Sequence, residues 1–147
     1  MMRFFIDTNV ILDWLIPTNA FHTEATSLIR ECLSGNAAAA VSAHSLTDIF
    51  YNFAKIFFCR DPSAILAILV SNFKVIPEST TDFQSVLSAE NFFDLEDGLQ
   101  IRCAEKEKLD FIVTENLKAF MNSKVLAISI SAALSRLSTN STEFDKL

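Results

Sequence analysis

Short apolar runs alternate along this chain with longer segments in which apolar residues recur at helical spacing. Five runs bounded by polar residues are typical of buried strands, at residues 4–7, 38–42, 73–76, 111–114 and 125–128. The segments between them predict helices over residues 21–33, 45–58, 63–72, 80–89, 95–108 and 131–137. Strands joined by helices form mainly parallel sheets covered on both faces. We therefore predict an α/β fold: a three-layer α/β/α sandwich around a central, mainly parallel five-stranded sheet.

The length and composition predict one globular domain. The chain has 147 residues, of which half are hydrophobic, and this is enough for a single core. We expect a folded domain over residues 1–138 and a polar C-terminal tail over residues 139–147 that frays. No apolar run reaches the roughly 18 residues of a membrane span, and Asp7 interrupts the first apolar run, unlike a secretory signal. We expect a cytoplasmic protein that does not associate with a membrane.

Charge and cysteine usage exclude some functional classes. The net charge of −6 argues against broad, non-specific binding of nucleic acid, but it is compatible with an enzyme that holds nucleic acid through a metal ion. The three cysteines have no CxxC spacing and lie in apolar or helical surroundings, which predicts buried core residues and not a zinc site. No glycine-rich phosphate loop follows a predicted strand, so an enzyme with a nucleotide cofactor is not expected.

Acidic residues stand at several points that a parallel sheet brings to one edge. Asp7 ends the first predicted strand, and Glu115 follows the fourth. Asp48 lies in the first turns of the helix after the second strand, and Asp94 and Asp97 begin the helix over residues 95–108. Right-handed crossovers place all the carboxyl ends of the strands at one edge, where ligands bind. The sequence therefore predicts that Asp7, Asp48, Asp97 and Glu115 meet in one cleft, with Asp94 close by.

Such a cluster favours a hard divalent cation. Four carboxylates that lie together repel one another and have raised pKa values, unless a counter-charge is present. Mg²⁺ and Mn²⁺ prefer oxygen ligands and remove this cost. The hypothesis explains why a charged side chain, Asp7, stands between two apolar segments.

Each acidic residue also has a simpler interpretation on its own. Asp7 fits the N-cap of a helix that begins near Thr8, and Asp94 is best interpreted as an N-cap or a first-turn acid. Asp97 fits a first-turn acid, and Glu115 fits an exposed loop residue. Of the two histidines, His22 is expected to be exposed, and His44 fits a turn residue better than a catalytic one.

The stretches FFIDTNVILD, SAHSLTDIFY, DLEDGLQIRCA and DFIVTEN-LKAF resemble, in order, the successive motifs of PIN domains, most closely those of VapC-like toxin nucleases. The resemblance runs from about Arg3 to residue 128. It implies a three-layer α/β/α fold and RNA cleavage that depends on Mg²⁺ or Mn²⁺. It also implies four positions for the acidic cluster. The first three fall on Asp7, Asp48 and Asp97. Asn9 supports Asp7, and Asp94 is an extra acid upstream of Asp97.

The fourth position departs from the family pattern. Family members commonly carry Asp directly before the Phe of the last motif, where this chain has Ala119. We expect Glu115 to supply the missing carboxylate, with Thr114 and Asn116 as polar helpers. If Glu115 points elsewhere, a second metal ion would bind poorly. Asp48, which stands where the family often has Glu, shortens the reach of that ligand by one methylene.

The resemblance implies a metal-dependent endoribonuclease, the toxin component of a type II toxin–antitoxin system. We then expect an RNA substrate, a cognate antitoxin protein and a homodimer. Five aromatic residues of the segment over residues 45–58 fit a dimer or antitoxin surface, or equally a helix buried on most sides: Phe50, Tyr51, Phe53, Phe57 and Phe58.

Two other functional classes were considered. The first is a catalytically degenerate PIN domain that binds RNA or protein, which Ala119 and the acidic net charge favour. The second is a phosphotransfer domain of the haloacid dehalogenase or receiver type. Asn9 stands where that phosphatase signature has its second acid, and no Lys follows the last strand as a receiver requires, so this class is disfavoured.

Overall fold

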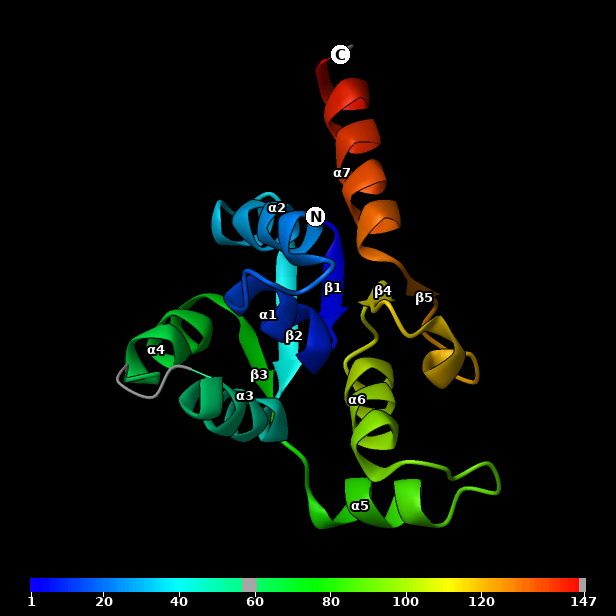
Figure 1. Cartoon of the computed structure of the whole chain (residues 1–147). Helices are drawn as coiled ribbons and strands as arrows, with labels where there is room; N and C mark the ends of the chain where they lie inside the picture. Colours follow the sequence, from blue (N-terminus) through cyan, green and yellow to red (C-terminus); the bar gives the residue numbers. More distant parts are fainter. Residues whose placement is uncertain (57–60, 146–147) are drawn as a thin grey trace.

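The computed structural model describes residues 1–56 and 61–145, and it contains a five-stranded sheet with all strands parallel, in the order β3-β2-β1-β4-β5 (Figure 1). The strands fall on the five predicted runs: β1 (Arg3–Ile6), β2 (Ala38–Ser42), β3 (Lys74–Ile76), β4 (Phe111–Val113) and β5 (Ala127–Ile128). The predicted five-stranded α/β fold is confirmed.

Helices connect these strands, mostly where the apolar spacing predicts them. They are α1 (Thr8–Leu15), α2 (His22–Leu33), α3 (Ala43–Ile56), α4 (Ser63–Asn72), α5 (Thr80–Leu87), α6 (Leu95–Lys106), the 3-10 helix η1 (Leu117–Phe120) and α7 (Ile130–Asp145). The predicted continuation of α3 to Phe58 lies outside the described residues. The segment expected at residues 131–137 is longer, because α7 continues through polar residues to Asp145. The boundary between a domain and a tail near residue 138 stays a prediction.

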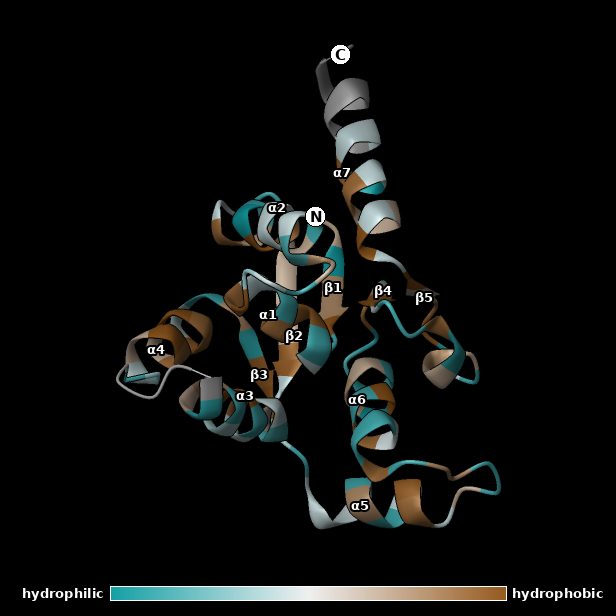
Figure 2. Ribbon diagram, viewed as in Figure 1, coloured by the Kyte–Doolittle hydropathy of each residue, from teal (hydrophilic) through white to brown (hydrophobic). Residues whose placement is uncertain are grey.

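The central strands are buried on both faces, and their side chains alternate between two hydrophobic clusters. Phe4 and Ile6 point into a cluster formed with residues of α1, α2, α3, α4 and α7, whereas Phe5 packs with residues of α6 and η1. The sheet is therefore the middle layer of a three-layer sandwich. Figure 2 shows the hydrophobic colouring of the central strands.

The strand order fixes where a ligand site is expected. The chain runs from the central strand β1 outward to β2 and β3, and then returns to the other side of β1 for β4 and β5. The order therefore reverses between β1 and β4, and parallel sheets bind ligands beyond the carboxyl ends of the strands at such a point. Asp7 follows β1 and Thr114 follows β4, so both stand at this position.

Other sequence predictions have mixed outcomes. Cys32 and Cys103 are buried as predicted, whereas Cys59 lies outside the described residues. On α3, Phe53 is buried, Phe50 and Tyr51 are exposed, and Phe57 and Phe58 lie outside the described residues. In the described part of the chain, none of the helices has the length and apolar character needed to cross a bilayer.

Candidate active site

Asp7 is a buried carboxylate at the end of the central strand. Its side chain is 2% exposed. The Thr114 hydroxyl donates a hydrogen bond to Oδ2 at 2.8 Å, and the Asn9 backbone amide donates to Oδ1 at 3.4 Å, so Asp7 is also the N-cap of α1. Burial raises the pKa of Asp7, and the hydrogen bonds from Thr114 and Asn9 offset part of this rise. The simpler N-cap interpretation is correct, and it is compatible with a role in a cation site.

A buried hydroxyl and amide network underlies the site and joins four elements. The Thr8 hydroxyl lies 2.6 Å from the Ser45 hydroxyl, which in turn lies 2.6 Å from the hydroxyl of Ser42. The Gln100 amide oxygen accepts a hydrogen bond from the Thr8 backbone amide at 3.0 Å. All four side chains are at most 3% exposed. The network therefore fixes the starts of α1 and α3 relative to β2 and α6, the elements that carry or flank the acidic residues.

The first turn of α6 brings two more carboxylates to Asp7. Asp94 is the N-cap of this helix, as predicted, and accepts a hydrogen bond from the Asp97 backbone amide at 2.9 Å. Burial, followed by the charges of Asp94 and Asp7, raises the pKa of Asp97 to about 6. Asp97 and Asp7 therefore lie close enough to repel each other, which is the electrostatic signature expected of a cation site.

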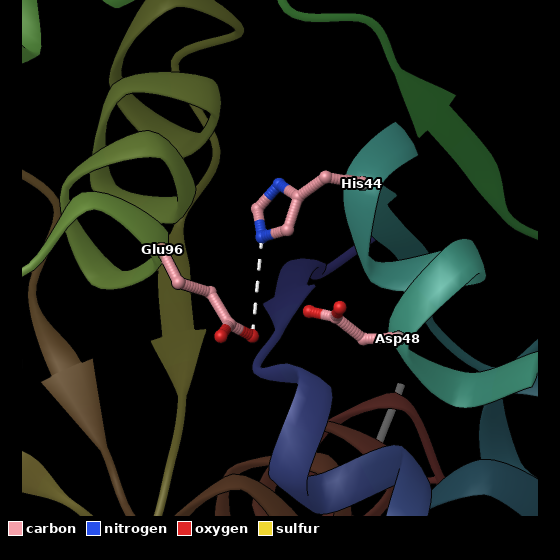
Figure 3. Close-up of side chains that lie close together, drawn as sticks. All are labelled: His44, Asp48 and Glu96. Carbon is pink, nitrogen blue, oxygen red and sulfur yellow. Dashed lines mark ion pairs between the residues drawn. The ribbon is translucent and has the colours of Figure 1, made fainter. Parts of the chain in front are cut away.

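Glu96 adds a carboxylate that the sequence analysis did not select. Its pKa is raised to about 7 by burial, by a hydrogen bond with Asp48 and by the Asp48 charge, while His44 lowers it. Figure 3 shows Glu96 extending from α6 toward Asp48 and His44 on α3. One ligand atom from each of these three side chains lies within 4.8 Å of the other two. The acidic site therefore includes residues at the end of β1, on α3 and at the start of α6.

In the segment after β4, Glu115 makes a contact that the sequence did not indicate. Oε1 of Glu115 accepts a hydrogen bond from the Ile130 backbone amide at 2.9 Å, so Glu115 caps the start of α7. The charges that raise the pKa of Asp97 come from Asp94 and Asp7. Among the described residues, Oε2 of Glu115 makes no such contact with α7, and the role of Glu115 as a ligand stays a prediction.

A pocket of about 690 Å³ opens beside the acidic cluster. Asp94 and Asp97 line it from α6, and Asn116 and Ala119 line it from the opposite segment after β4. The backbone amide of Asn116 is fixed by a 2.9 Å hydrogen bond to the Thr114 hydroxyl. Asn9, whose backbone amide donates to Asp7, is exposed.

The sequence did not identify Glu96 or Gln100 as part of this region, and it placed His44 near the cleft but favoured a turn residue over a catalytic one. Glu96 adjoins Asp97, but neighbouring helical residues usually face different directions, so spacing alone gave no reason to select it. His44 follows a strand end, which was the one available signal. Gln100 is one of several polar residues on α6, and its buried position depends on how α6 packs against α1.

The donor set of this region fits a divalent cation. Carboxylates from three separate elements face one another, and the pKa values of Asp7, Glu96 and Asp97 are all raised. Mutual repulsion of this kind is relieved by a positive charge among the oxygens, and Mg²⁺ and Mn²⁺ are bound in proteins by such oxygens.

Solved structures of toxins share this fold. The chain aligns with VapBC2 from Rickettsia felis bound to a promoter DNA fragment, with a TM-score of 0.63, 18% identity and coverage of 87% of this chain and 98% of that chain. It aligns with a toxin–antitoxin complex from Klebsiella pneumoniae with a TM-score of 0.62 and 21% identity, and the alignment covers 86% of this chain and 96% of that chain. It also aligns with VapC20 from Mycobacterium tuberculosis, which is described as a sarcin-ricin loop cleaving toxin. The TM-score is 0.58 with 14% identity, and the alignment covers 74% of this chain and 86% of that chain.

Sequence comparison identifies the family itself. No curated protein sequence matches the chain. A family model described as the PIN domain matches residues 3–118, which is most of the sequence and includes the strands β1 to β4 together with Asp7, Asp48 and Asp97. The chain therefore belongs to the PIN domain family.

Proposed function

We propose that this protein is a metal-dependent endoribonuclease that hydrolyses RNA phosphodiester bonds and acts as the toxin of a type II toxin–antitoxin system. The observation that carries the proposal is that Asp7, which follows β1 where the strand order reverses, lies near carboxylates at the start of α6, and one of these also contacts Asp48 of α3. Family membership supports a nuclease, and the descriptions of the similar structures as toxins and toxin–antitoxin complexes support the biological role.

In this proposal, Asp7, Asp48 and Asp97 hold Mg²⁺ or Mn²⁺, with Asp94 as an additional acid. A divalent cation supplies electrostatic stabilisation of the charge that develops on the phosphate during hydrolysis. Thr114 keeps the Asp7 carboxylate in position through its 2.8 Å hydrogen bond, and Asn9 and Asn116 support either end of the site. Glu115 is proposed to contribute through Oε2, because Oε1 is bound to the start of α7.

The reaction requires no covalent intermediate with the protein. The oxygen of water forms a bond to phosphorus, one phosphorus–oxygen ester bond breaks, and the departing oxygen takes up a proton. A carboxylate of the cluster accepts the proton that the attacking water loses. The pocket beside Asp97 and Asp94 offers space for the RNA next to the scissile bond.

Partner binding is part of the same proposal. A cognate antitoxin covers the acidic cluster, and a second copy of the chain binds elsewhere to give a homodimer. Exposed apolar side chains on α3 and α4 offer a surface for the dimer: Phe50, Tyr51, Ile68 and Val70. Seven of the ten residues of α4 are apolar, which exceeds what one buried helix face needs.

A labelled RNA pool incubated with the purified protein and Mn²⁺ tests the catalytic proposal. We expect fragments with the natural protein, and none after chelation or with the Asp97→Asn variant. A matched control is Glu90→Gln, which removes one negative charge at an exposed loop residue and should leave cleavage unchanged.

A degenerate, binding-only PIN domain is the second candidate, and two observations favour it. Ala119 replaces the family's fourth acid, and the nearby Glu115 already accepts a hydrogen bond from the backbone amide of Ile130. Intact RNA after incubation with a folded protein that binds Mn²⁺ would support this candidate and contradict the nuclease. Absence of growth arrest on expression in a bacterial host would contradict the toxin role.

A further inference from the structure

His44 is held in an orientation that leaves one ring nitrogen free for a ligand. Its Nδ1 lies 2.6 Å from Oε1 of Glu78, whose side chain is only 7% exposed. The backbone amide of His44 donates to the same carboxylate oxygen at 3.4 Å. A carboxylate at Nδ1 favours the tautomer with the proton on that nitrogen, so the lone pair of a neutral ring lies on Nε2.

Nε2 of His44 is buried and, within the described part of the chain, has no hydrogen-bond partner. The nearest acidic group is Oε1 of Glu96, at 3.9 Å, which is too long for a hydrogen bond. Burying a polar atom without a partner costs free energy. A metal cation placed between Nε2 and the carboxylates would supply the missing partner.

The surroundings of Nε2 contain the remaining ligands for a cation. Figure 3 shows the His44 ring and the carboxyl groups of Asp48 and Glu96 pointing into the same space between α3 and α6. The three ligand atoms lie within 4.8 Å of one another. Ligands bound to one metal ion at about 2.1 Å lie roughly 3 to 4 Å apart, so a modest inward rotation of these side chains completes a site.

We infer that His44, Asp48 and Glu96 form a mixed nitrogen and oxygen site that selects an imidazole-binding transition-metal ion, such as Co²⁺ or Zn²⁺, over Mg²⁺. The inference rests on the proposed function in one respect, since Asp48 also belongs to the proposed carboxylate site. An imidazole ligand favours these metals, whereas Mg²⁺ prefers oxygen atoms alone. Glu78 is a positioning residue in this site, because it orients the ring without contacting the ion.

Titration with Co²⁺ tests the inference without any measurement of RNA cleavage. The visible absorption of Co²⁺ changes when nitrogen and carboxylate ligands replace water, and a parallel calorimetric titration compares its affinity with that of Mg²⁺. We expect the natural protein to bind Co²⁺ at least tenfold more tightly than Mg²⁺. We expect His44→Ala to remove this preference and the absorption change while leaving Mg²⁺ binding unaltered.

Two further variants test the positioning role of Glu78 and the specificity for His44. Glu78→Gln should weaken Co²⁺ binding by roughly 10-fold to 100-fold, as expected for a group that orients a histidine ligand. His22→Ala changes the other histidine of the chain and should bind Co²⁺ like the natural protein. Circular dichroism spectra establish that each variant is folded.

A failure of this inference can be distinguished from a failure of the proposed nuclease function. Equal affinity for Co²⁺ and Mg²⁺, or Co²⁺ binding that His44→Ala leaves intact, would overturn the inference even if RNA is cleaved. No Co²⁺ binding at all by the folded natural protein would also overturn it. A positive result together with intact RNA would overturn the nuclease proposal and leave the metal site standing.

Discussion

The side-chain amide oxygen of Gln100 on α6 lies 3.0 Å from the backbone nitrogen of Thr8, the first residue of α1. The first amides of a helix have no partner inside the helix, and here a buried side chain from another element provides one. This hydrogen bond links the helix that follows Asp7 to the helix that carries Asp97. The relative position of two acidic residues therefore depends on a neutral amide.

Replacement of Gln100 by Leu tests this link. The variant leaves the Thr8 amide buried without its acceptor, so we expect the free energy of unfolding to fall by about 1–3 kcal/mol. Chemical denaturation with urea measures the change. Gln84→Leu is the control, because Gln84 is the other glutamine of the chain and is exposed on α5. Equal stability of the two variants would contradict the role given to Gln100.

Stability should depend on pH through Asp97. Its pKa is raised to about 6 from the usual value of 3.8, first by burial and then by Asp94 and Asp7. Between these values the folded state binds more protons than the unfolded state, so the contribution of Asp97 to stability is lost as the pH rises. We therefore expect the melting temperature of the metal-free protein to fall between about pH 4 and 6. The site is partly exposed, so solvent screening makes this fall smaller than the pKa shift alone would give.

The Asp97→Asn variant should show a flatter pH profile and a higher melting temperature at pH 7 than the natural protein, both in the presence of chelator. Thermal unfolding followed by circular dichroism measures both quantities. Glu90→Gln, a change at an exposed loop residue, should retain the natural slope. Parallel profiles for the natural protein and Asp97→Asn would argue against repulsion at the site.

Gly98 allows α5 to pack closely against α6. A Cβ atom at this position would lie 2.5 Å from Cγ1 of the buried Val86, whose branched side chain has little freedom to move away. We expect Gly98→Ala to cost about 1–3 kcal/mol from overpacking, despite the higher helix propensity of Ala. Val86→Ala provides space, so the double variant should be more stable than Gly98→Ala alone. Additive effects in this double-mutant cycle, measured with urea, would contradict the close approach.

Ala119→Asp should strengthen cation binding. Ala119 lines the same pocket as Asp97 and Asp94, on the wall formed by the segment after β4. Another carboxylate there should contribute about 1–2 kcal/mol of attraction, which corresponds to roughly a tenfold lower Kd for Mn²⁺. Ala89→Asp, at another position that lines this pocket, is the comparison and should gain less. Unchanged Mn²⁺ affinity in Ala119→Asp would show that residue 119 does not face the cation.

The sequence was informative where local patterns determine structure. The apolar runs located all five strands because a central parallel strand is buried on both faces, and β2 matches its predicted bounds. Asp94 was correctly interpreted as an N-cap, since capping depends on neighbouring residues alone. Topology predicts the positions of Asp7, Asp48 and Asp97, because a parallel sheet brings the carboxyl ends of its strands, and the starts of the helices that follow them, to one edge.

Contacts between distant segments were not predictable in the same way. Glu96 and His44 meet only because α6 packs opposite α3, and no spacing within either helix encodes that distance. The hydrogen bond that the Ile130 backbone amide donates to Glu115, at the start of α7, also joins segments that no local pattern relates. The extension of α7 beyond residue 137 is likewise invisible to hydrophobic periodicity, because its last turns are polar.

Calorimetric titration of Mn²⁺ into the natural protein, Asp7→Asn and Asp97→Asn tests the central claim most directly. Glu90→Gln, a change at an exposed loop residue, serves as a control of equal charge change, and circular dichroism establishes folding. The account predicts saturable binding to the natural protein and to Glu90→Gln, and loss of binding in the two site variants. A well-folded natural protein that binds no Mn²⁺ would contradict the carboxylate cation site and the nuclease mechanism built on it.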